Sequence, residues 1–279
     1  KMNTIGIWGT ETSGEINRRT LREMEDELKE FEIHLIFADG ELNSKRNPNA
    51  SRDSFDSLIN KGCDGIIIWG TDLPPREILQ IENEFPNIVL LNNQIELIDD
   101  KCFYFDHYQA GYACGQHLID KGHSNIACIT GWLETDDGNQ RHQGFLDVLN
   151  TNNVNMPQEL IFEGDYTYRK GYEGALSLLK QDQPFTALFC GNDQSAMSAI
   201  SAITNNGLQV PNDISVIGYD DMNIARYTSP PLTTVRIPFN RMAVSATRRL
   251  LNLCYNLELD INYDFPVQLI ERQSVKNIG

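Results

Sequence analysis

The sequence predicts an α/β fold in which parallel strands alternate with helices in two similar halves. Short apolar runs of strand length, such as Gly65–Trp69 and Ile126–Ile129, alternate with longer segments whose apolar residues recur every three or four positions. A repeated order of strand, helix and strand requires parallel strands joined by right-handed crossovers. The whole pattern occurs twice along the chain, so we expect two α/β halves with a cleft between them.

The elements of the first half follow from this periodicity. The expected strands are Asn3–Trp8, Ile33–Phe37, Gly65–Trp69 and Ile88–Leu91. One helical face is marked by Leu21, Met24, Leu28 and Phe31, and a second by Phe55, Leu58 and Ile59. A third helix is expected to begin at Pro74-Pro75, because proline is tolerated in the first turn of a helix.

The second half repeats the plan and then departs from it. Its expected strands are Ile126–Ile129, Leu160–Phe162, Ala187–Cys190 and Ser215–Ile217. Its helices are expected at Tyr112–Ile119, around Phe145 to Leu149, around Tyr172 to Leu179, and from Gln194 onward. A last helix, Phe239–Leu257, and a last strand, Pro266–Ile270, do not continue the alternation.

Composition limits the classes of protein to which the chain can belong. Its 279 residues suggest about two domains, and 41% hydrophobic with 22% charged residues is typical of a soluble globular protein. We expect no membrane partner, since no apolar run reaches the length of a membrane span. The net charge of −16 makes this chain a poor ligand for a phosphate backbone, so any binding to DNA would need another segment.

The six cysteines show neither CxxC spacing nor dense clustering. Three lie in apolar strand patterns, where cysteine behaves as a small hydrophobic residue. This pattern favours free thiols in a reducing, cytoplasmic compartment.

Catalytic and metal-binding motifs are absent from the sequence. It contains no GxxxxGK[ST], HExxH, GxSxG or strand-following GxGxxG motif. The five histidines lack ligand spacing with carboxylates or thiols, which favours surface or satisfied core positions. The adjacent pairs Asp136-Asp137 and Asp220-Asp221 each lie on a turn and point apart. We therefore expect no enzyme activity, no cofactor and no metal.

Two polar turns follow buried strands in the second half. Gly191-Asn192-Asp193 comes after Ala187–Cys190, and Gly218-Tyr219-Asp220-Asp221 comes after Ser215–Ile217. In an open α/β sheet, the carboxyl ends of the strands border the ligand crevice. The sequence therefore predicts that these turns contribute to a binding site.

Several ordered motifs carry a resemblance to a known family. The run Val210–Asp221, followed by Ser229–Val235, strongly resembles the effector-binding region of LacI/GalR family transcriptional regulators. Further matching motifs are Asp106 with Ala110-Gly111 and His117-Leu118, Lys121-Gly122-His123, Arg141 with Gly144-Phe145, and Phe189–Asp193. The resemblance covers nearly the whole chain, and Thr233–Arg236 with Met242-Ala243 looks most similar to the galactose-repressor branch.

The resemblance implies a periplasmic-binding-protein-like type I fold, with two doubly wound parallel-sheet lobes joined by three crossings. We expect an N-terminal lobe of residues 1–121 plus 238–261 and a C-terminal lobe of residues 122–237 plus 262–279. The helix from Phe239 would return to the first lobe, and the strand from Pro266 would complete the second. It also implies homodimers and a basic helix-turn-helix headpiece, not present in this sequence, that binds operator DNA.

The resemblance further implies a small-molecule effector, a mono- or disaccharide, bound between the lobes. Asp106 and Asp220 would accept hydrogen bonds from hydroxyl pairs, and Arg141 and Asn192 would complete the polar ring. Tyr166 and Phe239 would offer apolar faces to the sugar ring.

Each assignment has a simpler alternative. Asp106 and Asn192 can be helix N-caps. Trp69 and Trp132 can either stack on a sugar or serve packing alone.

The chain also departs from the family pattern. The loop Gly9–Gly14 lacks the Asn-Pro-Phe-Phe of many relatives, and Ile237 replaces a residue that is often polar, so the identity of the sugar stays open. The alternative function is a free-standing sugar-binding protein of a transport system, which would have a secretory signal where a regulator has its headpiece.

Overall fold

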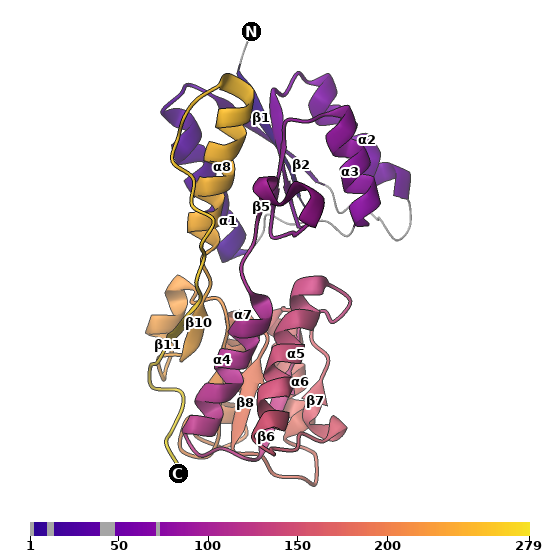
Figure 1. Ribbon diagram of the computed structural model, residues 1–279. Helices are drawn as coiled ribbons and strands as arrows, with labels where there is room; N and C mark the ends of the chain where they lie inside the picture. Colours follow the sequence, from indigo (N-terminus) through magenta and orange to yellow (C-terminus); the bar gives the residue numbers. More distant parts are fainter. Residues whose placement is uncertain (1–2, 10–13, 40–47, 71–72) are drawn as a thin grey trace. The chain divides into compact units, whose positions relative to one another are not determined.

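The computed structural model describes residues 3–9, 14–39, 48–70 and 73–279. The chain divides into two compact units (Figure 1). Unit 1 comprises Lys1–Phe105 and Pro238–Phe265, and unit 2 comprises Asp106–Ile237 and Pro266–Gly279. Both units are built on parallel sheets flanked by helices, which confirms the predicted fold class.

Unit 1 contains a five-stranded parallel sheet in the order β2-β1-β3-β4-β5. Its strands are β1 (Thr4–Gly9), β2 (His34–Asp39), β3 (Gly65–Trp69), β4 (Ile88–Leu91) and β5 (Cys102–Phe103). All five residues of β3 are buried, as its unbroken apolar sequence predicts for a central strand with helices on both faces.

Helices cover both faces of this sheet (Figure 1). They are α1 (Glu15–Lys29), α2 (Pro48–Asn60), α3 (Pro75–Glu84) and α8 (Phe239–Tyr255), with a 3-10 turn at Glu96–Lys101. Helix α8 buries Met242, Ala246 and Leu250, and its Arg248 Nε donates to Glu27 of α1 at 2.7 Å. A Cβ on Gly65 would lie 2.6 Å from Cys254 Sγ, so the close packing of α8 on β3 requires glycine there.

Unit 2 contains a four-stranded parallel sheet in the order β7-β6-β8-β9. Its strands are β6 (Ile126–Ile129), β7 (Ile161–Phe162), β8 (Ala187–Cys190) and β9 (Ser215–Ile217). Two further strands, β10 (Thr234–Arg236) and β11 (Gln268–Ile270), pair antiparallel. Two isolated parallel bridges, Ile217 to Thr233 and Asp220 to Arg236, connect the end of β9 and the loop after it to the β10 segment.

The helices of unit 2 are α4 (His107–Asp120), α5 (Asp136–Thr151), α6 (Tyr168–Leu178) and α7 (Asp193–Asn205). Helices α4 and α5 approach each other through reciprocal glycines. A Cβ on Gly111 would lie 2.0 Å from the Arg141 carbonyl oxygen, and one on Gly144 would lie 2.0 Å from that of Tyr108. This backbone-to-backbone contact fixes α5, and therefore Arg141, against α4.

The first unit boundary differs from the expected one. We expected the first lobe to extend to residue 121, whereas the compact units meet at residues 105 and 106. The boundary lies before α4 because α4 packs on α5, which belongs to unit 2. Helix α4 also begins five residues earlier than the apolar periodicity indicated, at His107 rather than Tyr112.

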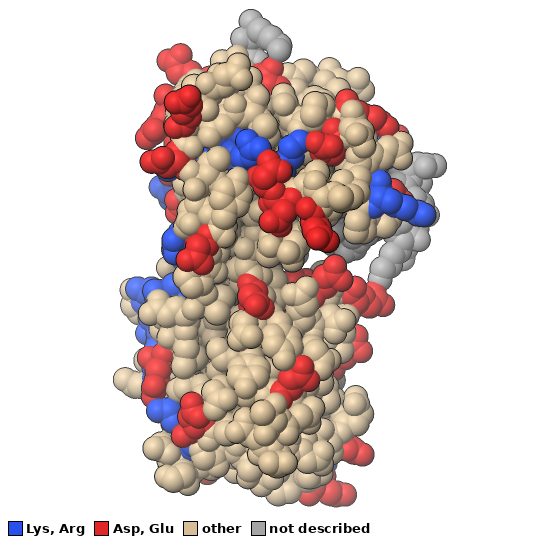
Figure 2. Space-filling view, in the orientation of Figure 1, with Lys and Arg blue, Asp and Glu red and all other residues tan. Residues whose placement is uncertain are grey.

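The cysteines are free thiols: five are buried and Cys254 is partly buried. Among the described residues, no helix is both long enough and apolar enough to span a bilayer. Acidic side chains are spread over both units on the face that Figure 2 shows, in keeping with the net charge of −16.

Candidate ligand-binding site

Three neighbouring strands of unit 2 bring polar residues to one edge of its sheet. In the strand register, Ile129 of β6 lies beside Cys190 of β8, and Phe189 lies beside Ile217 of β9. The segments that follow these strands therefore start next to each other, as parallel pairing requires. They carry Trp132, Asn192 and Asp220.

Arg141 of α5 is the centre of this edge. The residue is 6% exposed, and its guanidinium carbon lies 3.8 Å from the centroid of the Tyr219 ring and 5.3 Å from that of Tyr166. Nη1 donates to the Gly191 carbonyl, and Nη2 lies 3.6 Å from Asp137 Oδ2. We call Arg141, Tyr166, Tyr219, Asp137 and Asp220 the Arg141 cluster.

One nitrogen of Arg141 has no protein partner. Within the part of the chain that the structure describes, Arg141 Nε and Tyr166 Oη are buried atoms with no hydrogen-bond partner in good geometry. The Thr135 side chain lies near enough to the Tyr166 hydroxyl to lower its pKa, but not in good hydrogen-bonding geometry. Buried polar atoms of native proteins nearly always have partners, so two such atoms in one cluster indicate a place for a ligand.

Tyr166 is held by residues of two segments, those that follow β6 and β8. Asn192 Nδ2 donates to the Tyr166 carbonyl oxygen at 2.9 Å, and the Trp132 ring packs edge-on against it with centroids 6.0 Å apart. A Cβ on Gly131 would lie 1.9 Å from the Tyr166 ring, so only glycine fits beneath it. Tyr166 also has a φ of 68°, which non-glycine residues rarely adopt.

Asn192 and Asp106 both cap helices, the alternative that the sequence left open. Asn192 Oδ1 accepts from Ser195 N at 2.9 Å at the start of α7, and Asp106 Oδ1 accepts from Gln109 N at 2.8 Å at the start of α4. Asp106 is exposed, whereas Asn192 is buried, and both Nδ2 and Oδ1 of its side chain form hydrogen bonds. Ligand contact by either residue stays a prediction.

Charge in the Arg141 cluster is balanced by its neighbours. Burial alone would lower the pKa of Arg141. Four surrounding residues outweigh that effect, so the pKa of Arg141 is raised; they are Tyr166, Tyr219, Asp137 and Asp220. Burial likewise opposes ionisation of Asp137, yet the nearby Arg141 guanidinium leaves its pKa below the usual range. Arg141 and Asp137 are therefore both charged at neutral pH.

His107 and Tyr219 are two members of this region to which the sequence analysis gave no role. His107 Nδ1 lies 3.2 Å from Tyr219 Oη, and burial, with the nearby Arg141 charge, lowers the pKa of His107 to about 3. Burial raises the pKa of Tyr166 to about 12. The only sequence signal for Tyr219 was its position directly before Asp220. No local pattern in the sequence indicates that Tyr219 contacts Arg141.

In unit 1, the structure brings together the two aromatic residues that the sequence singled out. Trp69 is the last residue of the buried β3 and is 7% exposed, and its ring centroid lies 6.3 Å from that of Phe239 at the start of α8. The buried Phe105 packs edge-on against Phe239 at 5.7 Å. Packing therefore accounts for much of the Trp69 surface, and ligand contact by Trp69 and Phe239 stays a prediction.

The family-divergent loop Gly9–Gly14 falls mostly outside the described residues, since residues 10–13 are not among them. In the described ranges, no group of three or more histidine, cysteine or acidic residues is arranged to hold a metal ion.

Comparison with protein families and curated sequences identifies relatives along most of the chain. A family model described as a periplasmic binding protein-like domain matches residues 116–275. The HTH-type transcriptional repressor PurR of Photorhabdus laumondii is 36% identical over 236 residues, which cover 84% of this chain and 69% of that protein. A PurR of Actinobacillus pleuropneumoniae is 33% identical over 245 residues, covering 85% and 71%.

Solved structures of similar proteins share the whole fold. A transcriptional regulator of the LacI family from Burkholderia phymatum has a TM-score of 0.89 and 32% identity, covering 99% of this chain and 100% of that one. A sugar-binding transcriptional regulator from Escherichia coli, complexed with phosphate, has a TM-score of 0.87 and 30% identity, with coverage of 99% and 100%. A regulator from Lactobacillus casei with bound sucrose has a TM-score of 0.87 and 25% identity, with coverage of 98% and 100%.

Proposed function

Because this chain belongs to the LacI/GalR family of transcriptional regulators and forms an effector-binding region of that family, we propose that it senses a small sugar at the Arg141 cluster. The proposed ligand is a mono- or disaccharide. The relatives compared are named as transcriptional repressors and regulators rather than enzymes, which agrees with the predicted absence of catalysis. The galactose-repressor branch stays a prediction, since the curated relatives carry the name PurR.

The observation that carries the proposal is the pair of unpartnered buried atoms, Arg141 Nε and Tyr166 Oη. Both can bind a ligand oxygen, since guanidinium nitrogen donates a hydrogen bond and phenol oxygen donates or accepts one. The partly exposed Asp220 lies close enough to raise the pKa of both Arg141 and Tyr166. One small molecule with several hydroxyl groups can bond to Arg141 Nε and Tyr166 Oη and also reach the nearby Asp220 carboxylate.

A sugar fits the remaining chemistry of the site. Neighbouring hydroxyls can donate to one carboxylate, and the CH faces of a pyranose pack on aromatic rings such as Tyr166 and the 45% exposed Trp132. A similar regulator holds sucrose, and another is named sugar-binding. Asp106, Asn192, Trp69 and Phe239 are further proposed contacts, of which Asn192 acts in part by fixing Tyr166.

We also propose that ligand binding controls DNA binding through a helix-turn-helix segment outside this sequence, in a cytoplasmic homodimer. The first part is supported by the curated relatives, which are named HTH-type transcriptional repressors. A ligand with higher affinity for one of two arrangements of the protein shifts the population between them, and it thereby changes the affinity for operator DNA.

A thermal-shift screen tests the ligand class. A panel of mono- and disaccharides, including galactose, glucose and sucrose, is compared with a panel of nucleobases on the same protein. A ligand at 100 times its Kd stabilises the fold by about 2.7 kcal/mol through mass action, which is readily measured. We expect at least one sugar to raise the melting temperature.

Asp220→Asn then tests the site itself. Asparagine tolerates positive φ, so this change removes the charge while preserving the backbone at Asp220, where φ is 116°. The melting-temperature shift with the active sugar should fall sharply in Asp220→Asn and persist in the control Asp182→Asn, an exposed position of the same unit. If only nucleobases stabilise the wild type, the sugar assignment is wrong.

A further inference from the structure

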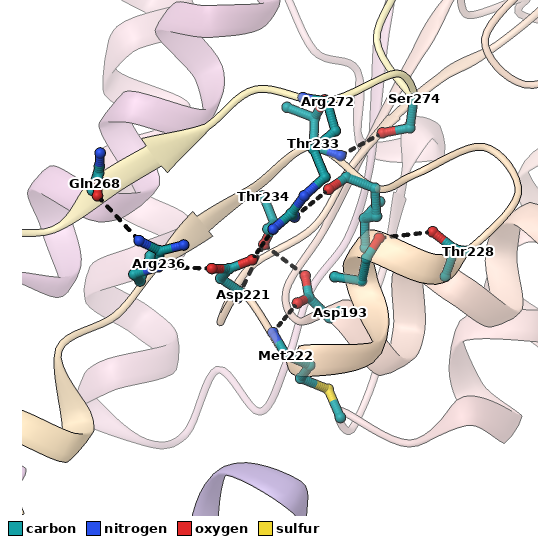
Figure 3. Close-up of polar contacts among 12 residues, drawn as sticks. Asp193, Asp221, Met222, Thr228, Thr233, Thr234, Arg236, Gln268, Arg272 and Ser274 are labelled. Carbon is teal, nitrogen blue, oxygen red and sulfur yellow. Dashed lines mark hydrogen bonds and ion pairs between the residues drawn. The ribbon is translucent and has the colours of Figure 1, made fainter.

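Directly after the proposed ligand residue Asp220 lies a buried carboxylate bound by two arginines. Asp221 is 3% exposed; its Oδ2 accepts from Arg236 Nε at 2.7 Å, and its Oδ1 accepts from Arg272 Nη2 (Figure 3). Burial alone would raise the pKa of Asp221, but both guanidinium groups lower it, so the carboxylate is charged. We call Asp221, Arg236 and Arg272 the arginine clamp.

The two arginines belong to different segments and are themselves fixed. Arg236 is the last residue of β10, and its Nη1 donates to Gln268 Oε1 of β11 at 3.4 Å. Arg272 follows β11; its Nη1 donates to the Leu232 carbonyl at 2.7 Å, and its backbone N donates to Thr233 Oγ1 at 2.9 Å. The clamp therefore ties the Asp221 side chain to both segments of the antiparallel pair.

A second buried carboxyl group, that of Asp193, also holds this loop (Figure 3), and burial raises its pKa well above the usual range. Asp193 is fully buried, and its Oδ2 accepts from Met222 N at 2.7 Å while its Oδ1 accepts from Thr234 Oγ1 at 2.6 Å. The backbone of Asp220 is also fixed, since its N donates to the Val235 carbonyl at 2.9 Å. Asp220 itself and the two residues that follow it are thus anchored to β10.

The loop needs this anchoring because its backbone is strained. Asp220 has a φ of 116° and Asp221 a φ of 53°, two consecutive non-glycine residues in the left-handed half of φ. Such conformations persist only where the surrounding structure imposes them, and they cluster at binding sites. The clamp, together with the hydrogen bonds of Met222 N and Asp220 N, is placed to maintain these φ values.

We infer that Asp221 is a positioning residue for ligand binding: through Arg236 and Arg272 it holds the strained 218–222 loop so that Asp220 faces the ligand. The inference rests on the proposed function, in which Asp220 meets the ligand. Its alternative is that the clamp stabilises unit 2 as a whole without any specific effect on Asp220.

Arg236 is the residue to replace, because its side chain is 49% exposed and its loss perturbs the core less than a change at Asp221, whose side chain is 2% exposed. Hydrogen–deuterium exchange is measured without ligand on Arg236→Gln, Arg236→Lys, Arg226→Gln and the wild type. Arg226 is an exposed arginine in the next turn of the chain. In Arg236→Gln we expect faster exchange in peptides covering residues 216–224 and unchanged exchange in residues 187–205. Arg236→Lys and Arg226→Gln should exchange like the wild type at residues 216–224.

Sucrose affinity, measured by calorimetry, tests the link to Asp220. Arg236→Gln should weaken sucrose binding about tenfold, the scale of one hydrogen bond to a charged group. In a protein that already carries Asp220→Asn, Arg236→Gln should alter sucrose affinity less than twofold, because the Asp220 carboxylate that the clamp positions is already absent. A purely structural clamp would give the same fold-change in both backgrounds.

The two measurements separate the failures. Unchanged exchange at residues 216–224 in Arg236→Gln overturns the inference, whatever binds. Equal fold-changes in the two backgrounds also overturn it and leave only a stabilising role. If sucrose does not bind the wild type, the choice of ligand is wrong. The exchange measurement, which needs no ligand, still decides whether the clamp holds the loop.

Discussion

The guanidinium of Arg141 stacks on the ring of Tyr219, with 3.8 Å between the guanidinium carbon and the ring centroid. The hydroxyl of that ring meets His107 Nδ1 at 3.2 Å, so α4, α5 and the loop after β9 converge on one buried cation. Planar stacking uses a property of arginine that lysine lacks. The position of Arg141 therefore depends on its shape as well as on its charge.

This relationship predicts that Arg141→Lys is not a conservative change. Lysine keeps the charge but loses both the stack on Tyr219 and the Nε donor. We expect ligand affinity to fall about tenfold to 150-fold, or about 1.5–3 kcal/mol, the typical value of a hydrogen bond to a charged group. Calorimetry with the most stabilising sugar of the screen measures it.

Arg169→Lys is the matched control for that experiment. Arg169 lies on α6 with a side chain 66% exposed and pairs with Glu173 on the surface. Its replacement should leave affinity unchanged. Equal affinity of Arg141→Lys and Arg169→Lys would remove Arg141 from the site.

Trp132 provides an optical test of where the ligand binds. The other two tryptophans, Trp8 and Trp69, are 1% and 7% exposed, whereas Trp132 is 45% exposed beside Tyr166. Acrylamide should therefore quench mainly Trp132, and a bound sugar should reduce that quenching. Trp132→Phe should abolish the sugar-dependent change while retaining an aromatic face. Quenching that is insensitive to a sugar already shown to bind would place the ligand elsewhere.

The contact between α4 and α5 predicts that Gly111→Ala is destabilising. The added Cβ would lie 2.0 Å from the Arg141 carbonyl oxygen, and a backbone oxygen cannot move aside as a flexible side chain can. We expect a loss of about 1–3 kcal/mol of unfolding free energy, the usual cost of overpacking. Denaturant titration measures it, with the exposed Gln109→Ala of the same helix as the control, expected to change stability by less than about 0.5 kcal/mol.

Most of the fold could be predicted from the sequence because its signals are local. The strand Gly65–Trp69 has the predicted bounds, since an uninterrupted apolar run ending in a polar turn is a sufficient signal. The apolar periodicity detected helix α4 only from Tyr112, because its first turn contains few apolar residues. Its start at His107 was indicated only by the capping alternative for Asp106, which the structure shows. Local patterns also indicated that Asp106 and Asn192 can be helix caps, because each capping hydrogen bond joins residues only three positions apart.

The Arg141 cluster could be predicted only in part. Asn192 and Asp220 follow strands, and parallel pairing places such residues at one edge of a sheet. The stack of Arg141 on Tyr219 joins distant segments through packing that no periodicity encodes. The same holds for the arginine clamp, because nothing near Asp221 in the sequence indicates that Arg272 binds it.

The burial of His107 predicts how stability depends on pH. Burial and the Arg141 charge lower the pKa of His107 to about 3 in the folded protein, while in the unfolded chain it is about 6.5. Above pH 6.5 the residue is neutral in both states. As pH falls below 6.5, only the unfolded state takes up the proton, so the folded state loses about 1.4 kcal/mol per pH unit from this residue. Burial lowers the pKa of His117, His123 and His142 as well, and their contributions have the same sign.

His107→Gln isolates this contribution, since glutamine can still bond Tyr219 Oη but does not titrate. Denaturant unfolding at pH 7.5 and pH 5 should show that the variant loses about 2 kcal/mol less than the wild type on acidification. The control is His34→Gln at an exposed position on β2, which should follow the wild type. A His107→Gln curve parallel to that of the wild type would mean that His107 is protonated within the fold. Its cation would then lie beside Arg141, and the charge balance of the cluster would have to be assigned differently.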